Sequence, residues 1–291
     1  MTESQRGIAD LRRGAVRLVT MPTAERQRLL RQCLIGVEEH WQQWVEQAWA
    51  AKRIPVGDSS CAEDVLTGPI PTVRYLQLLD QTLDDITCHG KPLLPGEPYQ
   101  NVVGRANSSV AGGRLRVPVF PTRNMFDRLL FAPIKAQVWM PEGVTTDAIF
   151  GDGVRRATGR APDDPTVTLV LGAGNISSIP ITDTLTKIFQ ENQAVLLKMN
   201  PVNEYLGPVF EKAFAPLIDG DLLRIVYGGA DVGAGLIASD EIDRIHITGS
   251  NRTHDSIVWG ATPAEQSDRK SRDAPLLSKT ITSELGNVSP W

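Results

Sequence analysis

Cysteine is scarce in this sequence: Cys33, Cys61 and Cys88 are the only three among 291 residues. Three widely spaced cysteines are too few for the disulfide framework of a small secreted domain or for a cysteine-ligated zinc site. We therefore expect no metal site and a reducing, cytoplasmic location.

Long apolar runs and an excess of positive charge are also lacking. The opening segment MTESQRGIADLRRG has no apolar core of signal-peptide length, and no window reaches the length of a membrane span. The net charge is −4, whereas a protein that binds nucleic acid through a basic surface carries a lysine and arginine excess. We expect neither nucleic acid nor membrane as a partner. The hydrophobic content of 41% is sufficient for a globular core.

The first part of the chain has a helical pattern. Thr23 is a plausible N-cap, and apolar residues recur at three- and four-residue steps from Leu30 to Ala48. A second helix is expected over residues 73–86, bounded by Pro71. Short strands are expected at 115–120 and 137–140, and Pro118 would make the first of these an edge strand. We predict a helical N-terminal region at 1–110 and a second domain at 111–291.

Strands and helices alternate after Asp164. Apolar runs at 167–171, 194–198, 222–227 and 244–248 predict strands, and helices are expected at 181–190, 204–215 and 231–238. Continuous apolar runs are typical of parallel strands that are buried on both faces. The predicted fold class is α/β: a Rossmann-like parallel sheet with covering helices, preceded by a helical N-terminal region.

The expected strand ends carry chemically distinctive residues. Ligands of parallel sheets bind at the carboxyl ends of the strands, where loops lead into helices. Here those ends are GAGN at 172–175, Lys198, YGGADVG at 227–233 and TGS at 248–250. Ser250 can cap the next helix, whose N-terminal amides suit a pyrophosphate. Each signal is weak alone, and together they predict a nucleotide site.

Asn175 stands in the stretch LVLGAGNISSIP at 169–180, where a dinucleotide fingerprint would continue toward a third glycine. On the residues alone, the favoured interpretation of Asn175 is a cap on a helix that begins at Ile176.

Taken in order, five segments resemble the cofactor-binding domain of the aldehyde dehydrogenase superfamily. They are GAGN at 172–175, LLKMNP at 196–201, GGADVG at 228–233, ITGS at 247–250 and SELGNVSP at 283–290, and the helix TAERQRLLRQCLIGVEEH at 23–40 is also similar. The resemblance implies an NAD(P)-dependent oxidoreductase that converts an aldehyde to a carboxylic acid. It covers about 125 residues in order, and it does not indicate which aldehyde.

The resemblance also implies roles for individual residues. The catalytic pair would be Asn175, whose amide stabilises the developing oxyanion, and Glu284, the general base. Lys198 would bind the adenosine ribose, and residues 248–250 would lie against the pyrophosphate and nicotinamide. The complete set of expected cofactor contacts is Leu171, Gly172, Asn175, Lys198, Gly229, Gly233, Thr248, Gly249, Ser250 and Leu285.

Two departures from the family pattern affect the cofactor. Ala173 and Gly174 replace a Pro-Trp pair, so the wall beside the nicotinamide must differ. Pro201 stands where a glutamate would accept the ribose hydroxyls and repel a 2′-phosphate. Both NAD and NADP are therefore left open.

The third departure concerns the nucleophile. The resemblance implies a cysteine in a catalytic domain that follows Glu284, whereas Cys33 is expected on the apolar side of the first helix, and Cys61 and Cys88 in N-terminal loops. We expect this chain to be a truncated portion of a dehydrogenase, inactive alone, with the strand at SELGNVSP buried in the whole enzyme. It would form a homo-oligomer or pair with a complementary catalytic half.

Three other functions are left open. An acyl-CoA reductase-like branch would run the chemistry through a CoA thioester, although Glu284 favours hydrolysis. A non-catalytic nucleotide-binding subunit would keep Lys198 and the glycine loops without a nucleophile. A methyltransferase-like domain ranks last, because it predicts an acidic residue where Lys198 stands.

Overall fold

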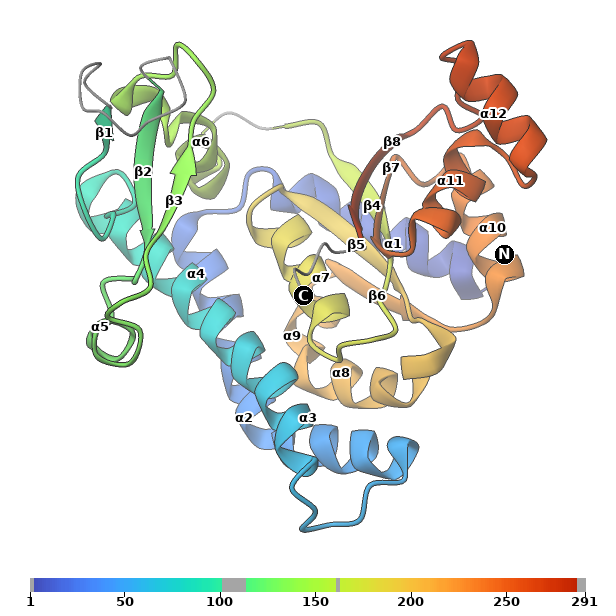
Figure 1. Ribbon diagram of the computed structural model, residues 1–291, viewed down its shortest axis with the longest axis horizontal. Coiled ribbons are helices and arrows are strands. Elements are labelled where there is room, and N and C mark those ends of the chain that lie inside the picture. Colours follow the sequence, from blue (N-terminus) through green and yellow to red (C-terminus); the bar gives the residue numbers. More distant parts are fainter. Residues whose placement is uncertain (1–2, 101–113, 161–162, 287–291) are drawn as a thin grey trace. The chain divides into compact units, whose positions relative to one another are not determined.

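The computed structural model describes residues 3–100, 114–160 and 163–286, and the chain divides into two compact units (Figure 1). The first unit combines residues 1–80 with 156–291, and the second comprises residues 81–155. The first helices thus share a compact unit with the C-terminal half of the chain. The predicted domain boundary at 110/111 lies outside the described residues. Within the described residues, no helix is both long and apolar enough to cross a membrane.

The first unit is built on a parallel five-stranded sheet with the order β6-β5-β4-β7-β8. Its strands are β4 (Thr166–Leu171), β5 (Gln193–Lys198), β6 (Leu223–Val226), β7 (Arg244–Gly249) and β8 (Thr280–Leu285). Every residue of β5 is buried, as expected for a central strand that is covered on both faces. The predicted α/β class with a parallel sheet is confirmed.

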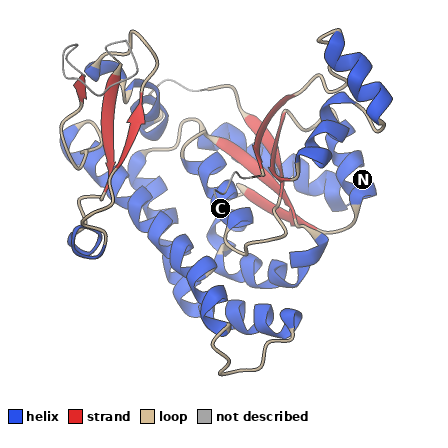
Figure 2. Ribbon diagram, in the orientation of Figure 1, coloured by secondary structure: helices blue, strands red, loops and turns tan. Residues whose placement is uncertain are grey.

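Helices cover both faces of this sheet (Figure 2). On one face, α1 (Glu3–Leu18) and α10 (Ala230–Ala238) share a buried cluster with β4 and β5, which contains Leu11, Leu169, Leu196 and Leu236. On the other face, α7 (Ile179–Phe189) packs against β4 and β5. The sheet is thus held in a sandwich of helices that leaves the strand ends free to form a site.

The long helical pattern is confirmed as α2 (Thr23–Lys52), which is followed by α3 (Cys61–Thr67) and α4 (Pro69–His89). Thr23 is not the N-cap that we predicted. Pro22 precedes the helix, and the Thr23 hydroxyl instead donates to the carbonyl of Ala157 at 3.0 Å. Pro71 does not bound α4 but lies in its first turn, where a missing N–H costs no intrahelical hydrogen bond.

The predicted single helix at 204–215 is wrong. That stretch forms η2 (Pro201–Leu206), α8 (Gly207–Ala213) and α9 (Ala215–Asp219), because Pro208 and Pro216 each suit the start of a new helix. Helices α11 (Asn251–Trp259) and α12 (Pro263–Ser271) then connect β7 to β8. Strand β8 is largely exposed, because it lies at the end of the strand order and pairs with β7. The expectation that it is buried in the whole enzyme stays a prediction.

The second unit contains an antiparallel sheet with the order β1-β2-β3. Its elements are β1 (Tyr99–Gln100), β2 (Leu115–Phe120), α5 (Met125–Leu130), β3 (Ala136–Trp139), η1 (Thr146–Ala148) and the start of α6 (Gly151–Thr158). Pro118 does not place β2 at an edge. Strand β1 pairs only with Leu115 and Arg116, so the missing N–H of Pro118 lies beyond that short partner.

Candidate functional site

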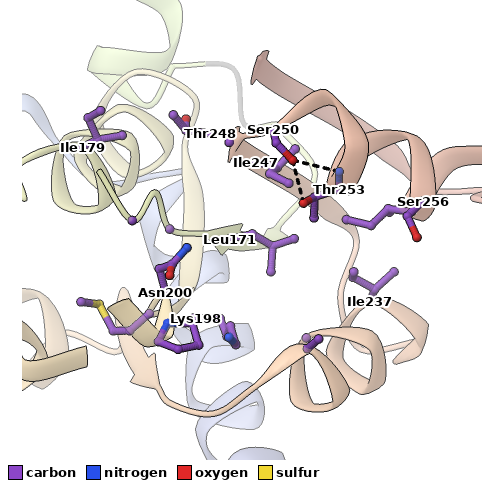
Figure 3. A pocket seen from close by; sticks show the side chains of 18 of the residues that line it. Leu171, Ile179, Lys198, Asn200, Ile237, Ile247, Thr248, Ser250, Thr253 and Ser256 are labelled. Atoms are coloured by element: carbon purple, nitrogen blue, oxygen red, sulfur yellow. Dashed lines mark hydrogen bonds between the residues drawn. The ribbon is translucent and has the colours of Figure 1, made fainter. Parts of the chain in front are cut away.

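A cavity of about 1120 Å³ lies at the carboxyl ends of the parallel strands in the first unit (Figure 3). Residues at the ends of β4, β5 and β7 line it, together with residues of α10, α11 and β8. This is the edge of a parallel sheet at which ligands generally bind.

The structure brings nearly all of the sequence-predicted site residues to this cavity. Those that line it are Leu171, Gly172, Asn175, Lys198, Gly229, Gly233, Thr248, Gly249, Ser250 and Glu284. Leu285 is not among the lining residues; it ends β8, opposite Gly249 of β7. The roles assigned to these residues stay predictions, whereas their common location is a structural result.

The turn after β4 is held by short contacts. The N–H of Gly172 donates to the carbonyl of Lys198 at 3.0 Å, and Gly174 lies close to the amide of Asn200. A Cβ atom at position 174 would come within 2.9 Å of that amide carbon, which explains the glycine. Beneath the turn, the indole of Trp44 in α2 donates to the hydroxyl of Ser177 at 3.0 Å, so a buried core residue supports the loop.

Asn175 is not a helix cap. Helix α7 begins at Ile179 with Ser178 before it, so the predicted start at Ile176 is wrong, and the reason lies in the Ser177–Trp44 contact that holds this segment as a turn. The Asn175 side chain is exposed at the cavity rim. Its amide has no hydrogen-bond partner in the part of the chain that the structure describes, so it is free to meet a ligand.

Lys198 brings an unpaired charge to the cavity. Its side chain extends from the end of β5, the residue is only 6% exposed, and its ammonium forms no ion pair or hydrogen bond with any described residue. Burial lowers the pKa of Lys198, and the carboxylates of Glu204 and Asp231 oppose that shift. A buried cation without a partner favours the binding of an anion or of strong acceptors.

The loop after β6 is shaped by glycine. Gly228 has a φ of +121°, and its N–H donates to the carboxylate of Glu204 at 2.7 Å. Gly229 then precedes α10, whose buried Gly233 also lines the cavity. The absence of side chains at Gly229 and Gly233 lets a ligand approach the backbone closely.

Ser250 caps α11 as predicted. Its hydroxyl accepts the N–H of Thr253 at 3.2 Å, and both residues line the cavity. A hydrogen bond holds the side chain of Thr248 in place: its hydroxyl donates to the carboxylate of Asp183 in α7 at 2.8 Å. The ring of buried His246 lies 3.4 Å from the same carboxylate and 2.8 Å from the Thr282 hydroxyl. A buried polar network therefore sets the position of the β7 end of the cavity.

Glu284 lies on β8, far from Lys198. Strands β4 and β7 separate β8 from β5, so Lys198 and Glu284 are three strand spacings apart, about 14 Å. Glu284 is exposed and level with Thr248 in the strand register. The cavity can therefore hold an extended ligand that reaches from a cation at one end to a carboxylate at the other.

None of the three cysteines lines the cavity. Cys33 is buried in α2, where burial raises its pKa to about 12, so its thiol is not a nucleophile near neutral pH. Cys61 and Cys88 do not lie in loops, as we had expected. Cys61 begins α3 with its thiol 3.4 Å from the carbonyl of Pro55, and Cys88 is exposed in the last turn of α4.

Sequence reasoning missed several lining residues. Asn200 follows Lys198 by two positions, and the alternation of side chains in extended chain could have indicated it. Thr253 lies one turn beyond Ser250 on α11, a helical spacing that could have been used in the same way. The apolar residues Ile179, Ile237 and Ile257 carried no sequence signal, because their place at the cavity depends on tertiary packing.

No protein-family model and no curated protein match the chain. Solved structures of aldehyde dehydrogenases do match its fold. One is Staphylococcus aureus AldH in a substrate-bound state, with a TM-score of 0.56 and 11% identity over 100% of this chain. Another is aldehyde dehydrogenase C from Pseudomonas syringae in complex with NAD+ and octanal, with a TM-score of 0.51 and 15% identity over 98%. A third is a putative aldehyde dehydrogenase from Anabaena variabilis, with a TM-score of 0.50 and 15% identity over 97%.

The chain spans 47%, 43% and 44% of these three structures, respectively. At identities of 11% and 15%, the similarity concerns the fold. The chain thus has the fold of a part of an aldehyde dehydrogenase.

Proposed function

We propose that this chain, with its aldehyde dehydrogenase-like fold, is the nicotinamide dinucleotide-binding part of an oxidoreductase that converts an aldehyde to a carboxylic acid. The observation that carries the proposal is the cavity at the carboxyl edge of the sheet, which combines the free amide of Asn175, the unpaired ammonium of Lys198 and the capped start of α11.

The residues present fit such a cofactor. The unpaired Lys198 needs an acceptor, and the bare backbone at Gly229 leaves room beside it for an adenosine ribose. The first N–H groups of α11 and the loop 248–250 suit a pyrophosphate in the middle of the cavity. A dinucleotide bound in this direction would have its nicotinamide toward Asn175 and Glu284, and it would supply the hydride acceptor there.

Asn175 and Glu284 are the proposed catalytic groups. The amide of Asn175 is free to donate to an aldehyde oxygen as negative charge develops on it, an effect of about 3–4 kcal/mol in acyl transfer. The exposed carboxylate of Glu284 is accessible to water, as a general base for hydrolysis must be.

The placement of the cysteines supports the further proposal that the chain alone does not oxidise aldehydes. A thiolate must attack the aldehyde carbon before a hydride can leave, and neither buried Cys33 nor the two other cysteines line the cavity. This observation also favours a second candidate function, a nucleotide-binding subunit. Such a subunit would pair with a separate catalytic partner or would form a homo-oligomer.

We retain the cytoplasmic location as a prediction from the low cysteine count.

A fluorescence titration of the intact chain with NADPH and NADH tests the binding proposal. We expect saturable binding of at least one of them, and a loss of at least about tenfold in its affinity in Lys198→Met, since an ion-assisted hydrogen bond contributes about 1.5–3 kcal/mol. Lys212→Met is the control, because Lys212 is an exposed lysine of α8 outside the cavity. Absence of binding, or equal losses in both variants, would contradict the proposal.

A further inference from the structure

The second unit exposes a group of large apolar side chains at one end. We call Met125, Phe126, Leu129, Leu130 and Ile134 the apolar tip. Each of the five is more than half exposed, and Met125 and Leu129 reach 82% and 77%. They belong to α5 and to the connection from α5 to β3, which Figure 1 shows projecting from one end of the antiparallel sheet. Single exposed apolar residues are common on soluble proteins, whereas a group of this kind marks a contact surface.

Hydrogen bonds fix α5 so that the apolar tip faces outward. The side chain of Asn124 accepts the N–H of Phe126 at 2.8 Å and caps the helix. Asp127 is fully buried, and its carboxylate accepts a hydrogen bond from the Thr122 hydroxyl. The four tip residues of α5 recur at one- and four-residue steps, so they share the broad side of the helix that points away from Asp127. Their exposure is therefore a consequence of how the helix is held.

Two aromatic contacts hold the same segment to the antiparallel sheet. The ring of Phe131 lies 5.6 Å from that of Phe120 in β2, measured between their centres. The guanidinium of Arg116 lies 3.9 Å from the centre of the Trp139 ring in β3. These two rings thus serve the fold of the unit, whereas the more exposed side chains of the apolar tip are left to meet something else.

The charge around the apolar tip is positive. Residues 114–141 contain five basic residues and one acidic residue, which is the buried Asp127. Exposed Arg128 and Lys135 form no ion pair with any described residue, and the other three basic residues each contact a described partner. Arg128 lies among the tip residues of α5, and Lys135 directly follows the tip in the sequence. Exposed apolar side chains bordered by free cations are typical of segments that bind the surface of an anionic membrane.

We propose that the apolar tip inserts into the surface of an anionic lipid membrane, with Arg128 and Lys135 at the level of the lipid headgroups. A lipid surface is favoured over a protein partner by these two free cations, and by residues 114–141 having no acidic residue except buried Asp127. The expectation of no membrane partner rested on the lack of a signal peptide and of a membrane span, and an interfacial contact requires neither. The inference does not depend on the dinucleotide site.

Co-sedimentation of the intact chain with lipid vesicles tests the proposal. We expect the chain to sediment with phosphatidylcholine vesicles that contain about one third phosphatidylserine, and to bind vesicles of phosphatidylcholine alone at least about tenfold more weakly. Leu129→Glu places a carboxylate in the middle of the apolar tip at a side chain that the fold leaves exposed. It should weaken binding to the anionic vesicles at least about tenfold.

Leu66→Glu is the matched control. Leu66 is a 61% exposed leucine of α3 outside the second unit, so the same exchange there should leave vesicle binding within about twofold of the wild type. A second variant, Arg128→Gln with Lys135→Gln, removes the charge and keeps the apolar side chains. It should weaken binding to the anionic vesicles about 30-fold and leave the weak binding to phosphatidylcholine unchanged.

Three results would overturn this inference. Failure of the chain to sediment with the anionic vesicles would exclude the membrane contact. Equal binding by the wild type and Leu129→Glu, or an equal loss in Leu66→Glu, would show that the apolar tip is not the surface that binds. Light scattering that shows a dimer, which Leu129→Glu converts to a monomer while the wild type binds no vesicles, would show that a second copy of the chain covers the tip.

Discussion

At the scale of single residues, the three thiols differ in their access to solvent. Cys33 is fully buried in α2 with its pKa raised to about 12, Cys61 is half-buried, and Cys88 is exposed. We predict that iodoacetamide at pH 8 modifies Cys88 rapidly and leaves Cys33 unmodified until the protein is unfolded in denaturant, because the reactive species is the thiolate. Peptide mass spectrometry after timed quenching measures this.

Cys33→Ala should leave the early labelling unchanged, because Cys88 accounts for it. Rapid labelling of Cys33 in the native protein would contradict the packing of α2 and would reopen the question of an available nucleophile in this chain.

Residue-level prediction from sequence worked where the signal was local. Lys198, Ser250 and the glycines follow strands that could be recognised from their apolar runs, so their meeting at one edge was predictable. The His246–Asp183 contact was not predictable, because it joins residues 63 positions apart in the sequence. Asn200 was overlooked, although its spacing of two residues from Lys198 could have indicated it.

At the scale of elements, helix α1 is held against the sheet by a close backbone contact and an ion pair, neither of which follows from a periodic sequence pattern. Gly14 of α1 approaches the chain so closely that a Cβ atom there would overlap the carbonyl oxygen of Asp221. Arg12 of the same helix pairs with Asp243 at 2.7 Å, and that carboxylate also accepts the N–H of Val167 at the start of β4. The helix is thereby locked to the edge of the sheet opposite the cavity.

We predict that Gly14→Ala destabilises the protein, although alanine is the better helix former. The helix propensity favours alanine by about 1 kcal/mol, while forced overpacking against backbone costs about 1–3 kcal/mol or more. Gly7→Ala in the same helix is the matched control, because a Cβ atom there meets only the Arg224 side chain at 3.6 Å. Urea unfolding should show a lower midpoint for Gly14→Ala and an unchanged or higher one for Gly7→Ala. The reverse order would contradict the docking of α1.

Element boundaries were predicted best for buried strands and worst for short helices. The boundaries of the four predicted parallel strands lie within one residue of those of β4, β5, β6 and β7, since continuous apolar runs mark them. The division of 201–219 into three short helices was missed, because the helical spacing of apolar residues continues through Pro208 and Pro216. Pro118 led to the wrong prediction that β2 is an edge strand. Its neighbour β1 is only two residues long, so no hydrogen bond from the backbone nitrogen of Pro118 to β1 is required.

At the scale of the whole molecule, the chain has a built ligand cavity without a thiol in it. We predict no NAD(P)H formation, followed at 340 nm, when the chain is mixed with NAD+ or NADP+ and with short or medium-chain aldehydes. The reason is that no cysteine lines the cavity, so a thiol adduct of the aldehyde cannot form beside the nicotinamide.

A triple variant with Cys33, Cys61 and Cys88 each changed to alanine serves as the control and should behave identically. Turnover by the wild-type chain that this variant abolishes would contradict the assignment of these cysteines as ordinary thiols.

A crystal structure of the chain grown with NADP+ or NAD+ is the most direct test of the dinucleotide site. We predict electron density that crosses the ends of β5, β4 and β7, with the adenosine ribose at Lys198, the pyrophosphate at the start of α11 and the nicotinamide toward Asn175 and Glu284. Density at any other place on the chain, with this cavity left to water, would contradict the account.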